Sequence, residues 1–256
     1  MIRKFAIATV LASILATPVP GWAQSPAETD ALRLLSAFAS YTDLRLRSVQ
    51  ESLEILAATT EARSGRWEGM KGLVAGFQES DGGLVAWYAR PDGTYWTGDK
   101  GRMSVTLSDR DYFPDLMAGK DILGALVISK STGQRSAVIA VPLKRGGKVV
   151  GAIGASVFLE RLSNEVASAL SLGKNAAFYA LAPNGLTTLH RKADRHFLDP
   201  RELGSDSLKA AANEMLSKTS GTVAYEFDQT LKKALYRTSP LTQWRFVLTF
   251  DAAPQP

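Results

Sequence analysis

Residues 107–159 read LSDRDYFPDLMAGKDILGALVISKSTGQRSAVIAVPLKRGGKVVGAIGASVFL, and they are the most informative part of the chain. A polar run from Ser108 to Asp111 leads into Tyr112 and Phe113. The remainder predicts one apolar strand, a polar turn and a hairpin, with strands at 125–128, 137–143 and 149–158. An arginine beside aromatic residues, ahead of a small antiparallel sheet, is typical of a pocket for a small anion. The stretch holds no catalytic set, so we interpret it as a recognition site.

The first 23 residues have the order of a secretory signal peptide. Arg3 and Lys4 precede an apolar run at 5–17, and Ala23 provides a small residue for cleavage. The run is too short to cross a bilayer comfortably. We therefore expect a periplasmic or secreted protein cleaved after Ala23, with an uncleaved anchor as the alternative.

The composition is that of an ordinary globular protein. The 256 residues are 45% hydrophobic and 21% charged, and no cysteine is present, so the fold must rely on its core rather than on disulfides. Loss of Arg3 and Lys4 with the signal peptide lowers the net charge from +5 to +3. Because this charge is small and scattered, we do not expect nucleic-acid binding.

An enzyme would need a site that this sequence does not supply. His190 and His196 are the only histidines, and their spacing of six is not that of a helical metal pair. Asp194 and Asp199 lie nearby and would complete the one candidate metal site. Without cysteine or a nucleophile elbow, we expect no catalytic residues, no metal and no cofactor.

A long amphipathic helix is predicted from Ala31 to about Ala62, because this range lacks glycine and proline. Apolar or small residues recur at alternating spacings of three and four, at Leu35, Phe38, Thr42, Leu46, Val49, Leu53 and Leu56. At about 1.5 Å per residue the helix is roughly 45–50 Å long, enough to support two lobes. A dimerisation coiled coil would give the same pattern. A shorter helix is predicted at 66–77.

An aromatic hairpin follows, with strands at 84–90 and 94–97. If Asp92 and Gly93 form its loop, Tyr88 and Tyr95 lie close together on one face, and the other face carries Trp87 and Trp96. The first face would either wall a pocket or fill a core.

The second half repeats the order of the first. A connecting helix at 159–172 is followed by a hairpin, a helix at 207–217 and three more strands. The five strands are predicted at 176–181, 186–190, 222–227, 232–238 and 244–250. The architecture repeats although the sequence does not.

Several runs of residues resemble the Cache domains of extracytoplasmic sensors. They are Ser108-Asp109-Arg110-Asp111-Tyr112-Phe113, Ile128-Ser129-Lys130-Ser131-Thr132-Gly133, Ala140-Val141-Pro142, Gly147-Lys148-Val149-Val150-Gly151 and Phe158-Leu159-Glu160. The layout of the whole chain is similar to a double Cache domain. The resemblance implies an α+β fold with two PAS-like lobes, each an antiparallel sheet, that share the long N-terminal helix. It also implies a sensor whose membrane-distal lobe binds a small molecule, in chemotaxis or another signalling system.

The sequence differs from that of typical Cache sensors in two respects. Family sensors are usually joined to a kinase, chemotaxis or cyclase module, and none occurs before Pro256, so we expect a signal to pass through a partner. The amino-acid-binding members carry an aspartate that holds the ligand amine where this chain has Ser156, so the resemblance does not extend to the partner of an amine.

The predicted pocket combines residues from three segments. Arg110 would hold a carboxylate through paired hydrogen bonds. The other candidates are Tyr112, Tyr88, Tyr95, Ser129, Lys130, Arg135 and Ser156. Arg135 joins Ser156 only if Gly146-Gly147 forms a two-residue turn with unbroken pairing, since a one-residue slip would move it to the other face. A surface network of Asp109, Arg110 and Asp111 is the alternative for the arginine.

We therefore predict a sensory protein that binds a small organic acid and signals through a membrane receptor or a homodimer, by way of the long helix. The alternative is a protein-interaction or dimerisation module with an empty pocket. The expected segments are a signal peptide at 1–23, the two helices at 24–80, the ligand-binding lobe at 81–160, a connecting helix at 161–173, the second lobe at 174–251 and a tail at 252–256.

Overall fold

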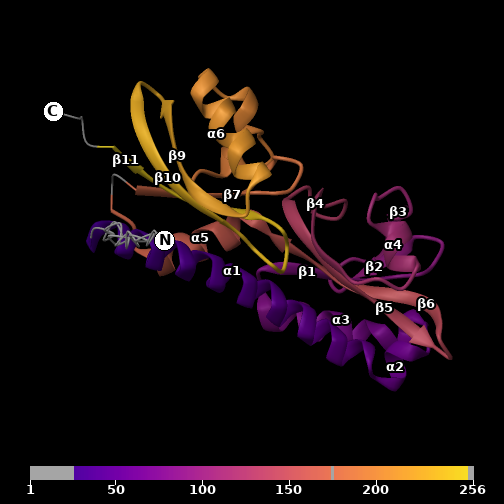
Figure 1. Cartoon of the computed structure of the whole chain (residues 1–256). Helices are drawn as coiled ribbons and strands as arrows, with labels where there is room; N and C mark the ends of the chain where they lie inside the picture. Colours follow the sequence, from indigo (N-terminus) through magenta and orange to yellow (C-terminus); the bar gives the residue numbers. More distant parts are fainter. Residues whose placement is uncertain (1–25, 174–175, 253–256) are drawn as a thin grey trace, which may run out of the picture.

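The structure, a computed structural model, describes residues 26–173 and 176–252. The predicted signal peptide and its cleavage site lie outside these residues. Figure 1 shows one long helix running beneath two sheets that lie side by side along it. The prediction of an α+β fold with two antiparallel sheets and a shared N-terminal helix is confirmed.

The long helix α1 covers Pro26–Ala57. Its apolar stripe is buried as predicted from Leu35 to Leu53, while Leu56 is partly buried, and Phe38 packs edge to face against Phe178 and Phe246 of the second sheet. The helix ends earlier than Ala62. Thr59 turns the chain, because its hydroxyl donates to the carbonyl of Leu56 at 2.7 Å and accepts the amide of Ala62 at 3.2 Å. Threonine competes with the helix for backbone groups in this way. The next helices are α2 (Thr60–Arg63) and α3 (Trp67–Asp81).

The first sheet has six antiparallel strands in the order β3-β2-β1-β6-β5-β4. The strands are β1 (Leu84–Ala89), β2 (Thr94–Thr97), β3 (Gly101–Thr106), β4 (Ile122–Ile128), β5 (Arg135–Arg145) and β6 (Lys148–Phe158). The short helix α4 (Phe113–Met117) lies between β3 and β4. The sequence did not predict β3 or α4. One face of this sheet packs against α1 and α3, and the other carries a separate apolar cluster that includes Trp87, Tyr95 and Phe113.

The second sheet has five antiparallel strands in the order β8-β7-β11-β10-β9. They are β7 (Ala176–Leu181), β8 (Thr187–His190), β9 (Ser220–Phe227), β10 (Thr230–Thr238) and β11 (Arg245–Asp251). The remaining helices are α5 (Leu159–Leu170), two 3-10 turns (Ala193–Arg195 and Pro200–Glu202) and α6 (Asp206–Ser217). Without β3, the strand order of the first sheet is the same as that of the second. The repeat predicted for the architecture is therefore present in the topology.

The two sheets meet where β4 touches the turn before β11. Gly124 has a left-handed backbone (φ +80°) at an irregularity of the β4–β5 pairing. A Cβ atom there would lie 3.3 Å from Thr242 and 3.3 Å from the indole of Trp244. Trp244 is buried, so β4 rests directly on the core of the second sheet.

The pairing of β1 with β2 differs from the prediction. Pro91, Asp92 and Gly93 form a three-residue loop, in which Gly93 has φ +84° and the amide of Arg90 donates to the carbonyl of Thr94 at 2.8 Å. Three-residue hairpin loops favour glycine in a left-handed conformation. Tyr88 therefore pairs with Trp96, and Tyr95 lies on the opposite face with Trp87. The expectation that Tyr88 and Tyr95 share a face is wrong.

The pairing of β5 with β6 also shifts by one residue. Gly146-Gly147 forms the predicted two-residue turn, with Arg145 paired to Lys148. An irregularity between Leu143 and Lys144 then moves the register, so Val138, not Ala137, pairs with Ser156. A one-residue shift exchanges the faces of a strand. Arg135 consequently points away from the Ser156 face, and its predicted position beside Ser156 is wrong.

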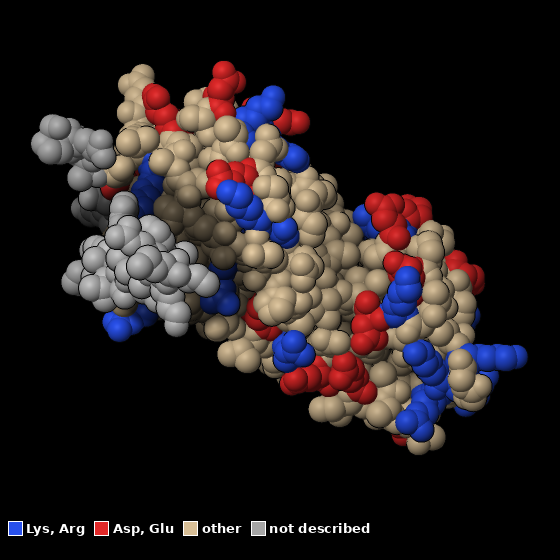
Figure 2. Space-filling model, in the orientation of Figure 1, with Lys and Arg blue, Asp and Glu red and all other residues tan. Residues whose placement is uncertain are grey.

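Charged side chains of both signs are spread over the face drawn in Figure 2. Exposed cations gather at the end formed by α2 and the β5–β6 turn, namely Arg63, Arg66, Lys144, Arg145 and Lys148. Within 26–173 and 176–252, no helix is long and apolar enough to span a bilayer.

Candidate functional site

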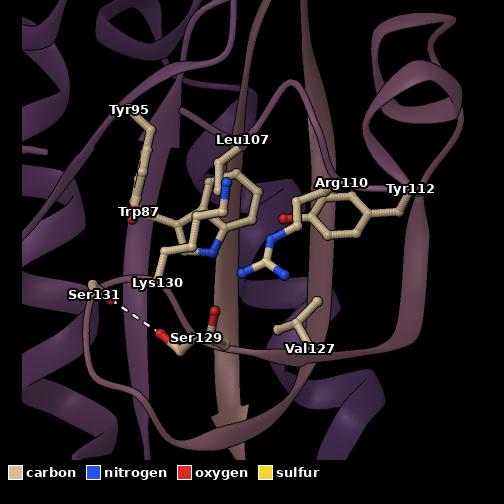
Figure 3. A pocket seen from close by; sticks show the side chains of 10 residues that line it. Trp87, Tyr95, Leu107, Arg110, Tyr112, Val127, Ser129, Lys130 and Ser131 are labelled. Carbon is tan, nitrogen blue, oxygen red and sulfur yellow. Dashed lines mark hydrogen bonds between the residues drawn. The ribbon is translucent and has the colours of Figure 1, made fainter. Parts of the chain in front are cut away.

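A small pocket lies on the face of the first sheet that is turned away from α1. Its interior is about 20 Å³, roughly the space of one water molecule. Figure 3 shows the side chains that surround it. They come from β1, β2, β4, β6, the loop after β3 and the turn after β4, and they are Trp87, Tyr95, Leu107, Arg110, Tyr112, Val127, Ser129, Lys130, Ser131 and Ser156.

The floor is made by Trp87 on β1 and by the small residues of β6. Trp87 is paired with Gly154, and its indole lies so close that a Cβ on this glycine would be 2.3 Å from it. Ser156 lies two residues further along β6 on the same face and is buried. The small residues that the sequence places on this face of β6 therefore make room for the indole, which fills part of the space.

Arg110 is held by the loop between β3 and α4. The amide of Leu107 donates to the carbonyl of Gly93 at 2.8 Å, and the amide of Arg110 donates to the carbonyl of Leu107 at 3.0 Å. The side chain reaches across toward Val127 and Ser129 (Figure 3), where Nη2 donates to the carbonyl of Ile128 at 2.6 Å. Its Nε is buried and has no hydrogen-bond partner within the described residues.

Two tyrosines complete the wall. Burial raises the pKa of Tyr112 far above its usual range, although the nearby Arg110 charge opposes this shift. Burial likewise raises the pKa of Tyr95, and Arg110 again opposes it. Both phenols are therefore neutral at physiological pH and can donate. The hydroxyl of Tyr95 is buried and has no partner among the residues that the structure describes.

The turn after β4 closes the pocket from the side. The hydroxyls of Ser129 and Ser131 lie 3.1 Å apart. Lys130 extends back toward the loop after β3, where its Nζ donates to the carbonyl of Thr106 at 2.7 Å and to the carboxylate of Asp109 at 2.5 Å. This ion pair lowers the pKa of the exposed Asp109 carboxyl. No carboxylate lines the pocket in the described part of the chain.

Six of the eight predicted residues line this pocket: Arg110, Tyr112, Tyr95, Ser129, Lys130 and Ser156. Tyr88 does not. It lies on the α3 side of the sheet, stacked on Trp96 at 5.6 Å between ring centroids, and its hydroxyl donates to the carbonyl of Gly65 at 2.6 Å. Arg135 is exposed at the start of β5, on the other face.

Sequence reasoning missed four lining residues: Trp87, Leu107, Val127 and Ser131. The register of the β1–β2 hairpin would have identified Trp87, because glycine as the third residue of a Pro-Asp-Gly loop indicates a three-residue connection. Leu107 and Val127 carry no polar group, so composition gave no reason to select them.

A second, larger hollow of about 470 Å³ lies between α1 and the start of β9. Among the residues that the structure describes, the one charged residue of its lining is Arg237, whose Nη1 donates to the hydroxyl of Ser36 at 3.1 Å. No predicted site residue lines it. Further along the chain, His196 is buried with its Nε2 3.1 Å from the hydroxyl of Ser163. Within the described ranges, no group of three or more His, Cys, Asp or Glu side chains is arranged to hold a metal.

No protein-family model matches the sequence, and no curated protein matches it. Solved structures do match in fold. The ligand-binding domain of the Pseudomonas aeruginosa PAO1 amino-acid chemoreceptor PctB, in complex with L-Arg, has a TM-score of 0.74 at 16% identity, covering 89% of this chain and 96% of that one. The sensory domain of the Campylobacter jejuni chemoreceptor Tlp3 (CcmL), with isoleucine bound, has a TM-score of 0.64 at 10% identity, covering 88% and 92%.

The extracellular ligand-binding receptor from Desulfohalobium retbaense DSM5692 has a TM-score of 0.71 at 14% identity. The match covers 87% of this chain but only 40% of that receptor. At such identities the likeness defines the fold alone. The fold is that of the double Cache type found in extracellular sensory domains of chemoreceptors, as the sequence resemblance implied.

Proposed function

We propose that this chain is an exported sensory domain that binds a small organic anion in the pocket of the first lobe, with Arg110 as the anchor. The observation that carries the proposal is a pair of buried polar atoms, Nε of Arg110 and the hydroxyl of Tyr95. Both lack a partner in the described part of the chain, and both belong to the lining of one pocket. An unsatisfied buried polar group costs about 1–3 kcal/mol, which a ligand with matching acceptors would recover.

The chemistry of the lining favours an acid without an amino group. A carboxylate would accept from Arg110 and from the neutral phenol of Tyr95, and charge-assisted bonds of this kind are the strong ones. An ammonium group would meet hydroxyls and two cations, Arg110 and Lys130, but no carboxylate. Asp109, on the loop after β3, is exposed and is paired with Lys130. We therefore favour small carboxylates over α-amino acids, although the similar receptors PctB and Tlp3 were solved with amino acids.

A thermal-shift screen of short carboxylates, their amino-acid counterparts, amines and purines would identify the ligand, because a saturating ligand raises the melting temperature by mass action. Calorimetry on the best compound then tests the anchor. Arg110→Ala should weaken binding by about 30-fold or more, as expected for loss of a charge-assisted hydrogen bond worth about 2 kcal/mol. Arg135→Ala is the matched control, since Arg135 is exposed on the opposite face. Equal affinities for Arg110→Ala and the parent chain would rule out this anchor.

A second candidate is the interaction module with an empty pocket. It is favoured by the outer face of α1, where large apolar side chains are exposed: Leu44 by 67%, Ile55 by 71% and Tyr41 by 37%. A full screen without any thermal shift would support this second candidate against the first. In either case we propose that the outer face of α1 contacts a partner, which is a receptor or a second copy of the chain. We also retain 81–160 and 174–251 as the limits of the two lobes, and a periplasmic or secreted location.

A further inference from the structure

The interior of the pocket is about 20 Å³, so any ligand larger than a water molecule requires part of the lining to move. The floor of the pocket, made by β1 and β6, is held in the middle of the sheet by the pairing of β1 with β6 and of β6 with β5. The rest of the lining includes the loop after β3, which carries Leu107 and Arg110, and the turn at 129–133, which joins β4 to β5. The turn is closed by hydrogen bonds from the amide of Ser129 to the carbonyl of Gln134 at 2.9 Å and from the amide of Gly133 to the carbonyl of Ser129 at 2.8 Å.

Three cations tie this turn to the opposite side of the pocket. Lys100 Nζ, from the β2–β3 connection, donates to the carbonyl of Ser131 at 2.5 Å. Arg110 Nη2 donates to the carbonyl of Ile128, just before the turn, at 2.6 Å. Lys130 reaches in the reverse direction and bonds both the carbonyl of Thr106 and the carboxylate of Asp109. Of the three, Lys130 is the one that belongs to the turn itself and also lines the pocket.

We propose that the turn at 129–133 is the gate of the pocket and that Lys130 is its latch. In the structure the Lys130 ammonium ties the gate to the loop after β3 through the carbonyl of Thr106 and the carboxylate of Asp109. When an anion enters, its negative charge replaces that of Asp109 as the partner of Lys130, so the same side chain closes the gate again from the inside. This inference rests on the proposed function for the nature of the ligand, but the opening of the gate does not depend on it.

The gate is tested without a known ligand by a thiol placed behind it. The chain has no cysteine, so Ser156→Cys gives a single thiol at the buried floor of the pocket. The rate at which this thiol reacts with methyl methanethiosulfonate, a small neutral reagent, reports how often the gate opens. In this background, Lys130→Met and Asp109→Asn should each raise the rate by about two- to fivefold, the effect expected from losing an exposed ion pair.

Lys144→Met is the matched control. Its Nζ also donates to a backbone carbonyl, that of Gly119 at 3.1 Å, but Lys144 does not line the pocket. Its labelling rate should equal that of the Ser156→Cys parent. Unchanged rates in both Lys130→Met and Asp109→Asn, in proteins with the parent melting temperature, would overturn the latch. An equal acceleration in Lys144→Met would overturn it too, because the effect would then be general loosening.

A second reagent separates this inference from the proposed function. The anionic 2-sulfonatoethyl methanethiosulfonate should react faster than the neutral reagent, relative to their rates with a free thiol, and Arg110→Met should remove this preference. A preference that survives Arg110→Met contradicts the anion site while leaving the gate intact. If Arg110→Met removes the preference for the anionic reagent but Lys130→Met does not accelerate labelling of the thiol, the anion site is supported and the gate is contradicted.

Discussion

A Cβ atom on Gly154 would lie 2.3 Å from Cζ2 of Trp87, because the indole rests directly on the β6 backbone. The pairing of Trp87 with Gly154 therefore fixes the floor of the pocket. Only glycine allows this approach, and a methyl group at position 154 must displace the indole.

Gly154→Ala should consequently destabilise the protein by about 1–3 kcal/mol, the usual cost of overpacking a buried site. Gly76→Ala provides the control. Gly76 is in the helix α3, and an added Cβ meets nothing within 4 Å, so this substitution should stabilise by about 0.5–1 kcal/mol. Urea unfolding followed by circular dichroism measures both. Equal midpoints for the two variants would contradict the packing described for Trp87.

The hydroxyl of Ser239 links the turn before β11 to the helix α1. Ser239 donates to the carboxylate of Asp43 on α1 at 2.7 Å and accepts the amides of Leu241 and Thr242, each at 3.0 Å. Burial raises the pKa of Asp43, and the hydrogen bond from Ser239 is the largest effect that opposes this rise. Ser239→Ala should therefore cost about 1–3 kcal/mol in the free energy of unfolding, since it leaves buried polar groups unpaired.

Ser52→Ala is the control for that substitution. The hydroxyl of Ser52 also donates one hydrogen bond, to the backbone carbonyl of Ser48 at 2.8 Å, but this bond is exposed on α1. The change in unfolding free energy for Ser52→Ala should be within about 0.5 kcal/mol of zero. A Ser239→Ala protein as stable as this control would show that the contact between α1 and the turn is dispensable.

Stability should fall in mild acid because of His190. Burial, followed by the neighbouring charges of His196 and Arg195, lowers the pKa of His190 to about 4 from an ordinary value of 6.5. Between about pH 4 and pH 6.5, His190 is therefore protonated in the unfolded chain but neutral in the folded chain. The contribution of the neutral His190 to the free energy of unfolding is thus fully present above about pH 6.5 and is lost as the pH falls toward 4. This free energy changes by at most about 1.4 kcal/mol per pH unit because of His190.

His190→Asn tests this pH dependence. The Nδ1 atom of His190 accepts the amide of Lys192 at 2.8 Å, and an asparagine side chain can accept the amide two residues ahead in the same way. We expect the variant to lose less stability than the parent between pH 7.5 and pH 5.0 in urea unfolding. The buried His196, whose pKa is also lowered, should account for part of the dependence that remains. Identical pH dependence in both proteins would exclude His190 as a cause.

Self-association is expected through the exposed apolar residues on the outer face of α1. The double variant Leu44→Glu/Ile55→Glu should be monomeric by light scattering at concentrations where the parent chain forms dimers, because it places charges in the contact. Leu231→Glu, which changes an exposed leucine (49%) on β10, should dimerise like the parent. A monomeric parent chain would contradict self-association and leave a separate receptor as the partner of α1.

The sequence predicted the order of helices and strands well, because each element has a strong local pattern. The buried stripe of α1 and the strands β5 and β6 are examples. It did not predict β3, whose residues are mostly exposed and whose sequence, Gly101–Thr106, is short and polar. Most strand and helix ends agreed within a few residues, and the early end of α1 arose from hydrogen bonds of Thr59 that periodicity cannot reveal.

The candidate site was predicted less completely, and both errors concern register. Tyr88 and Arg135 were chosen by assuming two-residue turns and unbroken pairing. A three-residue loop at Gly93 moved Tyr88 away from Tyr95, and the shift after Leu143 turned Arg135 to the other face. Side-chain alternation has a period of two, so a single extra residue reverses the side on which each residue points. Arg110 and Tyr112 were not affected, because they lie in a loop.

The contact between Gly124 and Trp244 has a mechanical consequence. The strand β4 carries the pocket turn at its far end, and near its start it is seated on an indole that belongs to the core of the other sheet. Any tilt of β4 that lifts the turn must either slide the glycine across the face of Trp244 or carry Trp244 along. In the second case the movement reaches Ser239, five residues before Trp244, and through it Asp43 on α1. A movement of the pocket turn in the first lobe would then be coupled through β4 and Trp244 to the second lobe and to α1.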